Sequence, residues 1–322
     1  MNRFNQILLA ILALQVLIAG GIFVASQPAS PDDIQSSLLA ANKDEIDKII
    51  IARNDHKQIL LRRVNGQWQL PDYYQLSASQ ARVNDMLDKL QTTKSGWPVA
   101  TTQSSHQRFE VSDNNFQKKI ILANGDNERQ TIYLGSSPGF RQLHIRKKGD
   151  DEVYAVKLNS FEFQTESSDW LDKNLLQPKQ DIVSLKGPDF SFDKQDSHWQ
   201  LVNGDGEIIE ESLNKLTDTL ARLTVQEAAE KPSGKIDYEL SVTTVSDKLI
   251  YQFFKANNQH FITRNDYEQA FKMNASDYEN ITSQTAKQLV KQTTASEKQP
   301  PMVEGKNKSP GENTIKSDNQ QS

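Results

Sequence analysis

A short motif occurs twice in this chain, and its repetition constrains the fold more than any other feature. Residues 65–70 read Asn-Gly-Gln-Trp-Gln-Leu, and residues 196–201 read Asp-Ser-His-Trp-Gln-Leu. A helical pattern follows each copy, because large apolar residues recur three or four positions apart and so fall in one stripe of a helix. The stripes are Val83, Met86, Leu87 and Leu90 after the first copy and Leu213, Leu216, Leu220 and Leu223 after the second. Strand-like apolar runs precede the copies, at 49–51 and 59–61 and at 182–185 and 190–192.

The similarity continues beyond the helices, where five strand-like segments of the first half align with five of the second. Turn pairs such as Asn124-Gly125 join neighbouring segments, which favours antiparallel pairing. Ser77 or Ser79 is placed to cap the first helix. The aligned segments are 109–111 with 238–240, 119–122 with 242–245, 131–134 with 250–253, 144–146 with 261–263, and 153–156 with 270–273. The pattern predicts an α+β fold with two tandem repeats, each a largely antiparallel sheet with a packed helix, at residues 44–176 and 177–293.

The N-terminal segment predicts one transmembrane helix. Residues 7–24 form an apolar run in which Gln15 is the only strongly polar side chain. As a helix this run just crosses a bilayer core of about 30 Å. Arg3 precedes it without an acidic residue, so residues 1–6 are expected to stay in the cytoplasm.

We therefore expect residues 7–26 to be an uncleaved signal anchor and residues 27–43 to be a stalk. The bulk of the chain would then lie on the periplasmic, extracytoplasmic side of a bacterial inner membrane. The alternative is a cleaved signal peptide with a small-residue site at residues 24–26. The apolar region of a signal peptide is usually shorter, about 7–15 residues, which favours the anchor.

The composition limits the kinds of partner and of catalytic chemistry that the sequence can support. The 322 residues carry a formal charge of −5, which favours neither nucleic-acid binding nor a polybasic membrane contact. The lack of cysteine excludes disulfides, thiolate zinc sites and thiol catalysis. No Walker A or G-x-G-x-x-G motif occurs, so we expect no bound nucleotide and no cofactor. Residues 294–322 are polar and poor in large apolar side chains, which predicts a disordered tail.

The order of these features resembles a bacterial family, the domain of unknown function DUF4340. The resemblance rests on the apolar N-terminal segment, the two Trp-x-Leu strand ends and the leucine-spaced helices after them. It also rests on three short motifs at residues 133–135 (Tyr-Leu-Gly), 153–154 (Val-Tyr) and 170–172 (Trp-Leu-Asp). The resemblance implies a membrane-anchored extracytoplasmic protein, often encoded beside ABC-transporter components of the gliding-motility type. The expected partners are the membrane, through residues 7–26, and other envelope or transporter proteins; the family supplies no catalytic residues.

One motif could carry catalysis. Residues 135–139, Gly-Ser-Ser-Pro-Gly, match the G-x-S-x-G pattern of a nucleophile elbow, in which Ser137 would be the nucleophile. The elbow requires a strand before the serine and a helix after it, and residues 140–146 read as extended instead. We therefore expect a hairpin loop at this position and no catalytic residue.

The other polar residues are expected to be structural. No two histidines stand at ligand spacing, and residues 203–207 lack the acidic ladder of a calcium loop, so we expect no metal site. The basic run at 146–148 lies beside the acidic run at 150–152, so we expect their charges to cancel and the acids to form a solvated turn. Trp68 and Trp199 hold the same place in the repeat, which favours a core role for both. The histidines are His56, His106, His144, His198 and His260.

The sequence therefore favours a non-enzymatic accessory or scaffold protein of the envelope, associated with an ABC-type transport system. Two alternatives stay open. An envelope hydrolase would use Ser137, and a helix after Gly139 would indicate it. A cell-wall or polysaccharide-binding module would show a cleft lined with exposed aromatic side chains.

Overall fold

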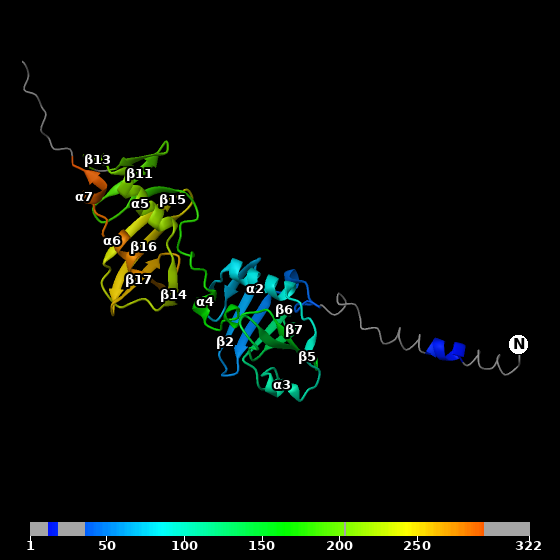
Figure 1. Cartoon of the computed structure of the whole chain (residues 1–322). Helices are drawn as coiled ribbons and strands as arrows, with labels where there is room; N and C mark the ends of the chain where they lie inside the picture. Colours follow the sequence, from blue (N-terminus) through cyan, green and yellow to red (C-terminus); the bar gives the residue numbers. More distant parts are fainter. Residues whose placement is uncertain (1–11, 19–35, 203, 293–322) are drawn as a thin grey trace, which may run out of the picture.

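The computed structural model describes residues 12–18, 36–202 and 204–292 (Figure 1). These residues contain a nine-stranded, an eight-stranded and a two-stranded sheet. The strand pairs in all three sheets are antiparallel. The prediction of a mixed fold of helices and antiparallel sheets is confirmed.

The first part of the chain forms the nine-stranded sheet and the helices around it, which we call unit 1. Its elements are η1 (Lys43–Glu45), β1 (Lys48–Arg53), β2 (Gln58–Val64), β3 (Gln67–Leu70), β4 (Leu76–Ser77), α2 (Gln80–Thr92), β5 (Pro98–Ala100), α3 (Ser105–Arg108), β6 (Lys118–Asn124), β7 (Asn127–Leu134), β8 (Leu143–Lys147), β9 (Val153–Val156), η2 (Ser160–Glu162) and α4 (Ser167–Trp170).

The second part forms the other two sheets, and we call it unit 2. Its elements are β10 (Ile182–Lys186), β11 (Ser191–Gln195), β12 (His198–Leu201), β13 (Glu207–Ile208), α5 (Glu210–Ala221), β14 (Val225–Ala229), β15 (Tyr238–Thr244), β16 (Lys248–Ala256), β17 (Gln259–Arg264), β18 (Ala270–Met273), α6 (Ala275–Thr282), α7 (Ala286–Leu289) and β19 (Val290–Lys291).

The two large sheets have the same order of strands. Unit 1 runs β4-β3-β2-β1-β6-β7-β8-β9-β5, and unit 2 runs β12-β11-β10-β15-β16-β17-β18-β14. In both, the strand after the long helix crosses the sheet and pairs with the last strand of the meander, as β5 does with β9 and β14 with β18. Unit 1 adds β4 as an extra edge strand.

Helix α2 closes the core of unit 1 because its apolar stripe faces the sheet. Its side chains Val83, Met86, Leu87 and Leu90 are all buried. Ser79 caps the helix by accepting a hydrogen bond from the amide of Arg82, as one of the two candidate caps should. The next residue, Gln80, clamps Trp68, since its amide group bonds both the N–H and the C=O of that tryptophan at 2.8 and 3.0 Å.

The two tryptophans of the repeated motif differ in their burial. Trp68 is 1% exposed and lies in the main apolar cluster. Trp199 packs against that cluster but is only half-buried. The prediction of a core role is therefore right for Trp68 and right only in part for Trp199.

One part of the predicted repeat alignment is wrong. Tyr238 begins β15, the counterpart of β6, so residues 238–240 belong to the sheet. Residues 109–111 follow α3 and lie outside the large sheet, where Val111 bridges to Phe116. The cause is that unit 1 has a longer connection before β6, which the apolar pattern alone does not separate from a strand.

The described residues include only part of the predicted stalk and anchor. Residues 36–43, assigned to the stalk, pack on unit 1, because Leu38 and Leu39 are buried in its core. Residues 12–18 are helical. The rest of the predicted anchor, the tip at 1–6, the stalk up to residue 35 and the tail at 294–322 lie outside the described residues. Among the residues described, no helix is both long and apolar enough to span a bilayer.

Unit 1 closes the outer edge of β14 in unit 2. The hydroxyl of Tyr73 accepts from the amide of Ala228 at 2.7 Å and donates to the carbonyl of the same residue at 3.0 Å. The carbonyl of Lys173 accepts from the amide of Val225 at 2.9 Å. Helix α4 contacts β14, and Figure 1 shows the two side by side at the junction. We call these contacts the inter-unit latch.

We expect Trp68→Ala to lower the free energy of unfolding by about 3–5 kcal/mol, the range for large-to-small changes in a core. Trp199→Ala should cost clearly less, because part of that side chain is already in contact with water. Urea denaturation of the purified protein, followed by circular dichroism, measures both changes. Equal losses would contradict the difference in burial.

We expect Tyr73→Phe to destabilise the protein by about 1–3 kcal/mol, since it removes two hydrogen bonds that close the edge of β14. Tyr74→Phe is the matched control, because Tyr74 is the exposed neighbour and should change stability by less than about 0.5 kcal/mol. Hydrogen exchange of the Ala228 amide gives a local readout. Unchanged protection of this amide in Tyr73→Phe would show that the latch is not formed in solution.

Candidate functional site

The two units differ most clearly in one connection, which in unit 1 joins β5 to β6. It spans residues 101–117, contains α3, and we call it the insert. The matching connection in unit 2, residues 230–237 between β14 and β15, has no helix. The insert builds a second apolar cluster from Val111, Phe116, Tyr133 and Val153, separate from the core under α2. Unit 1 therefore has apolar packing on both faces of its sheet.

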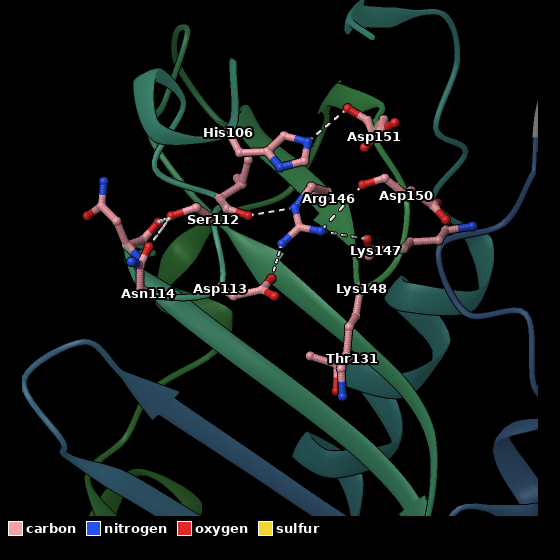
Figure 2. Close-up of polar contacts among 12 residues, drawn as sticks. His106, Ser112, Asp113, Asn114, Thr131, Arg146, Lys147, Lys148, Asp150 and Asp151 are labelled. Atoms are coloured by element: carbon pink, nitrogen blue, oxygen red, sulfur yellow. Dashed lines mark hydrogen bonds and ion pairs between the residues drawn. The ribbon is translucent and has the colours of Figure 1, made fainter. Parts of the chain in front are cut away.

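Arg146, on β8, fastens the insert to the sheet. The side chain is 4% exposed, and its Nε donates to the carbonyl of Val111 at 2.7 Å. Its Nη2 pairs with the carboxylate of Asp113, and its Nη1 donates to the carbonyl of Asp150 at 3.3 Å (Figure 2). The guanidinium lies over the ring of Tyr133, 4.6 Å from its centroid. All three guanidinium nitrogens thus have acceptors, which a buried cation requires.

A histidine of the insert makes a second link. His106, on α3, is buried, and its Nε2 lies 2.9 Å from the carbonyl oxygen of Asp151 in the β8–β9 turn (Figure 2). Between these two links lies a surface pocket of about 510 Å³, whose polar lining includes Ser112, Asp113 and Asp150.

Two of the three aspartates that line this pocket, Asp113 and Asp150, have pKa values shifted in opposite directions. The hydrogen bond from Arg146 lowers the pKa of Asp113. Partial burial raises the pKa of Asp150. Arg146 is fully engaged by protein acceptors, so the groups that the pocket offers to a ligand are its carboxylates and amides. The prediction that the charge of Arg146 cancels against the acidic run at 150–152 is wrong, because its carboxylate partner is Asp113 of the insert.

Ser137 lies in a loop, as the sequence predicts. Its hydroxyl lies 2.7 Å from the carbonyl oxygens of both Gly139 and Gln142. The segment after Gly139 is a turn followed by β8, so the helix of a nucleophile elbow is absent from residues 139–147.

The serine that faces a histidine is its neighbour, which sequence reasoning missed. Ser136 Oγ lies 3.0 Å from Nδ1 of His144 and 3.2 Å from the carbonyl oxygen of Phe109. The ring of His144 packs against Phe109 at 4.4 Å, and burial lowers its pKa. A usable signal exists, because Ser136 and His144 stand opposite each other where a predicted hairpin closes.

Gly135 allows the backbone at the start of this loop to lie close to the insert. A Cβ atom at this position would lie 2.0 Å from the carbonyl oxygen of Phe109. The amide of Ser136 donates to the same carbonyl at 3.0 Å. The glycine therefore serves a close approach of the insert to β7, and not a catalytic turn.

Within the described residues, no group of three or more His, Cys, Asp or Glu side chains could bind an ion. His198 lies on exposed β12, with Nδ1 2.8 Å from the carbonyl oxygen of Asp196. The ring of His260 packs on Tyr278 at 4.5 Å, and His56 lies in a turn with a positive φ. Glu207, the last residue of the glycine-rich segment that we expect not to bind calcium, begins β13.

Unit 2 has a pocket of its own beside the half-buried tryptophan. Trp199, Lys194, Gln180, Asp181 and Asn214 are among the residues that line a space of about 220 Å³ next to α5. The ammonium group of Lys194 lies over the indole, 5.7 Å from the ring centroid. An aromatic face with amide and carboxylate neighbours is suited to a small polar ligand.

Comparison with known proteins places the chain in a family. The model of DUF4340, a domain of unknown function, matches residues 68–242, which is more than half of the sequence. The chain therefore belongs to the DUF4340 family. The match runs from Trp68 in unit 1 to Val242 in unit 2, and both Tyr73 and Ala228 of the latch lie inside it. No curated protein and no solved structure matches the chain.

Asp113 should make the stability of unit 1 depend on pH. Its pKa is lowered in the folded state, so it stabilises the fold above the pKa of the unfolded chain, about 3.9, and loses this effect as the pH falls through the folded pKa. We expect Asp113→Asn to be destabilising at pH 7 and less so at pH 3. Denaturant titrations at both values measure this. Asp126→Asn, at an almost fully exposed carboxylate, is the control and should have little effect.

Proposed function

We propose that the protein is a membrane-anchored extracytoplasmic accessory or scaffold subunit of an ABC-type envelope transport system, with most of the chain in the periplasm. The apolar run at residues 7–24 supports the anchor. The helical residues 12–18 support it too, since Leu12, Leu14, Val16, Leu17 and Ile18 all expose more than half of their surface. The transporter association rests on what the family resemblance implies.

The observation that carries the scaffold role is the inter-unit latch. Two sheets with the same strand order, which we interpret as repeats at 44–176 and 177–293, are joined through an edge strand rather than through a flexible connection alone. Tyr73 and Lys173, both in unit 1, bond the backbone of β14 directly. Such a joint holds two contact surfaces at a fixed spacing, which is what a scaffold requires.

The hydrolase alternative now rests on Ser136 and His144 rather than on Ser137. The side chains of Ser136 and His144 both make structural contacts that a catalytic pair would have to give up. Ser136 Oγ is also within reach of the Phe109 carbonyl, and His144 is buried beneath the ring of Phe109. A nucleophile needs an approachable oxygen and oxyanion donors beside it. The contacts of Ser136 and His144 with Phe109 instead favour a structural role, in which they hold the insert against the sheet.

A polysaccharide-binding role is the second candidate, and the pocket beside Trp199 favours it. Its volume of about 220 Å³ suits one sugar-sized group. The flat indole would contact the apolar face of a sugar ring, and Gln180, Asp181 and Asn214 would bond hydroxyl groups at its rim.

Complementation of a null strain separates the three functions. We expect Ser136→Ala, Ser137→Ala and Trp199→Ala to restore function at normal protein levels. A form with residues 7–26 replaced by a cleavable export signal should fail, because tethering supplies the high local concentration that a scaffold needs near its membrane partners.

The opposite results have distinct meanings. Failure of either serine variant as a stable protein, together with success of the unanchored form, would overturn the scaffold proposal in favour of a hydrolase. Failure of a folded Trp199→Ala alone would favour the polysaccharide-binding role.

A further inference from the structure

The chain enters unit 1 at a defined corner. Ser36 accepts a hydrogen bond at its carbonyl from the amide of Ser95 at 3.1 Å, and the two hydroxyl groups lie 3.2 Å apart. Ser37 forms a β-bridge with Lys94, and its hydroxyl donates to the carbonyl of Gln91 at the end of α2. The first residues of the unit are therefore fixed to the segment that joins α2 to β5.

Two exposed apolar side chains stand directly beside this point. Trp97 follows Ser95 by two positions and is 64% exposed, and Val99 on β5 is 47% exposed. Strand β5 ends the order of its sheet, so its outer edge has no strand partner among the described residues. A large exposed indole on a soluble surface usually marks a contact, and here it lies where the N-terminal segment reaches the unit.

Chain length keeps this corner close to the anchor. Ten peptide bonds separate residue 26 from residue 36. A fully extended chain covers at most about 3.6 Å per residue, so these two residues lie no more than roughly 35 Å apart. Because Ser95 is bonded to Ser36, Trp97, two residues further on, lies only about 10 Å beyond that limit at most.

We propose that the corner formed by Lys94, Trp97 and Val99 rests on the lipid–water interface of the membrane in which residues 7–26 are inserted. This inference rests on the proposed anchor and adds an orientation for unit 1. Tryptophan is the residue best suited to that interface, because its ring is apolar and its N–H remains hydrated. The exposed Lys94 faces an anionic headgroup favourably.

Two further observations favour lipid over a partner strand. Pro98, at the centre of the edge, has no N–H to donate, and the pairing of β5 with β9 is irregular between Pro98 and Ala100, so the edge is a poor template for strand addition. The acidic run at 150–152 lies beyond Ala100, which pairs with Val153, and so at the end of β5 away from Trp97.

The absence of cysteine makes the test direct, since a single cysteine can carry a nitroxide label. Full-length Val99→Cys is labelled and placed in nanodiscs of phosphatidylcholine and phosphatidylglycerol, and collisions with oxygen and with a water-soluble nickel complex are compared by electron paramagnetic resonance. Val245→Cys is the matched control, because Val245 is 75% exposed in the β15–β16 turn of unit 2. We expect the label at position 99 to be shielded from nickel and accessible to oxygen, and the label at position 245 to show the reverse.

A second variant tests the role of the indole. Adding Trp97→Ser to the labelled Val99→Cys protein should restore access of the nickel complex at position 99. If the shielding persists, or if position 99 resembles position 245 from the outset, the inference is wrong. Shielding from nickel in native membranes but not in nanodiscs would identify a protein occupant instead and would also overturn it.

Failure of the anchor is visible separately. If the full-length protein does not elute with the nanodiscs, the proposed anchor fails before any label is read. If it does elute with them and the label at position 99 is freely accessible to nickel, the anchor stands and only the docking corner is refuted.

Discussion

The structure depends on one constraint: a wide antiparallel sheet has two faces, and a single helix covers one of them. In unit 2, β15 and β16 bury every second residue over most of their length, whereas β17 buries its last four residues, beside a small second cluster of Phe254, Phe261 and Ala270. In unit 1, β8 buries four consecutive residues and β7 buries its last four. Both faces of unit 1 are therefore covered, by α2 on one side and by the insert on the other.

Covering the second face brings polar groups into the interior, and these need partners. Arg146 and His144 point to that face because they alternate with Leu143 and Ile145 along β8. The insert supplies their partners: the Val111 carbonyl and Asp113 for the arginine, and the Phe109 ring for the histidine. What appears in the sequence as a possible catalytic loop with loose charges is thus the set of contacts that holds the insert in place.

This explains which features the sequence could predict. The stripe of α2, the cap at Ser79 and the loop at Ser137 depend on neighbours within a few residues, and periodicity and turn chemistry describe such contacts well. The ion pair between Arg146 and Asp113 joins residues far apart in the chain, and nothing in either local sequence marks it. The sequence neighbours of Arg146 predict that its charge cancels locally, but its surroundings are set by the pleat of β8.

The two units share a strand order but differ in the burial of equivalent side chains. Trp68 and Trp199 hold equivalent positions, yet Gln80 clamps only the first, and the second borders a pocket. The order of strands follows from the pattern of apolar residues, which both halves share. Both indoles have a basic cross-strand partner, Arg63 over Trp68 and Lys194 over Trp199, so equivalence in the repeat predicts position and this contact but not burial.

The edges of the two sheets explain why the units are joined where they are. An edge strand with free backbone groups invites pairing with other chains, and each sheet must deal with its own edges. Strand β4 has only two residues, β5 contains Pro98, and β14 is closed by Tyr73. Next to Tyr73, the turn before β4 holds Tyr74 and Gln75 at positive φ, a conformation that costs non-glycine residues on the order of 1–3 kcal/mol each. The hydrogen bonds of the latch offset part of this strain, and the same contact both closes the β14 edge and joins the two units.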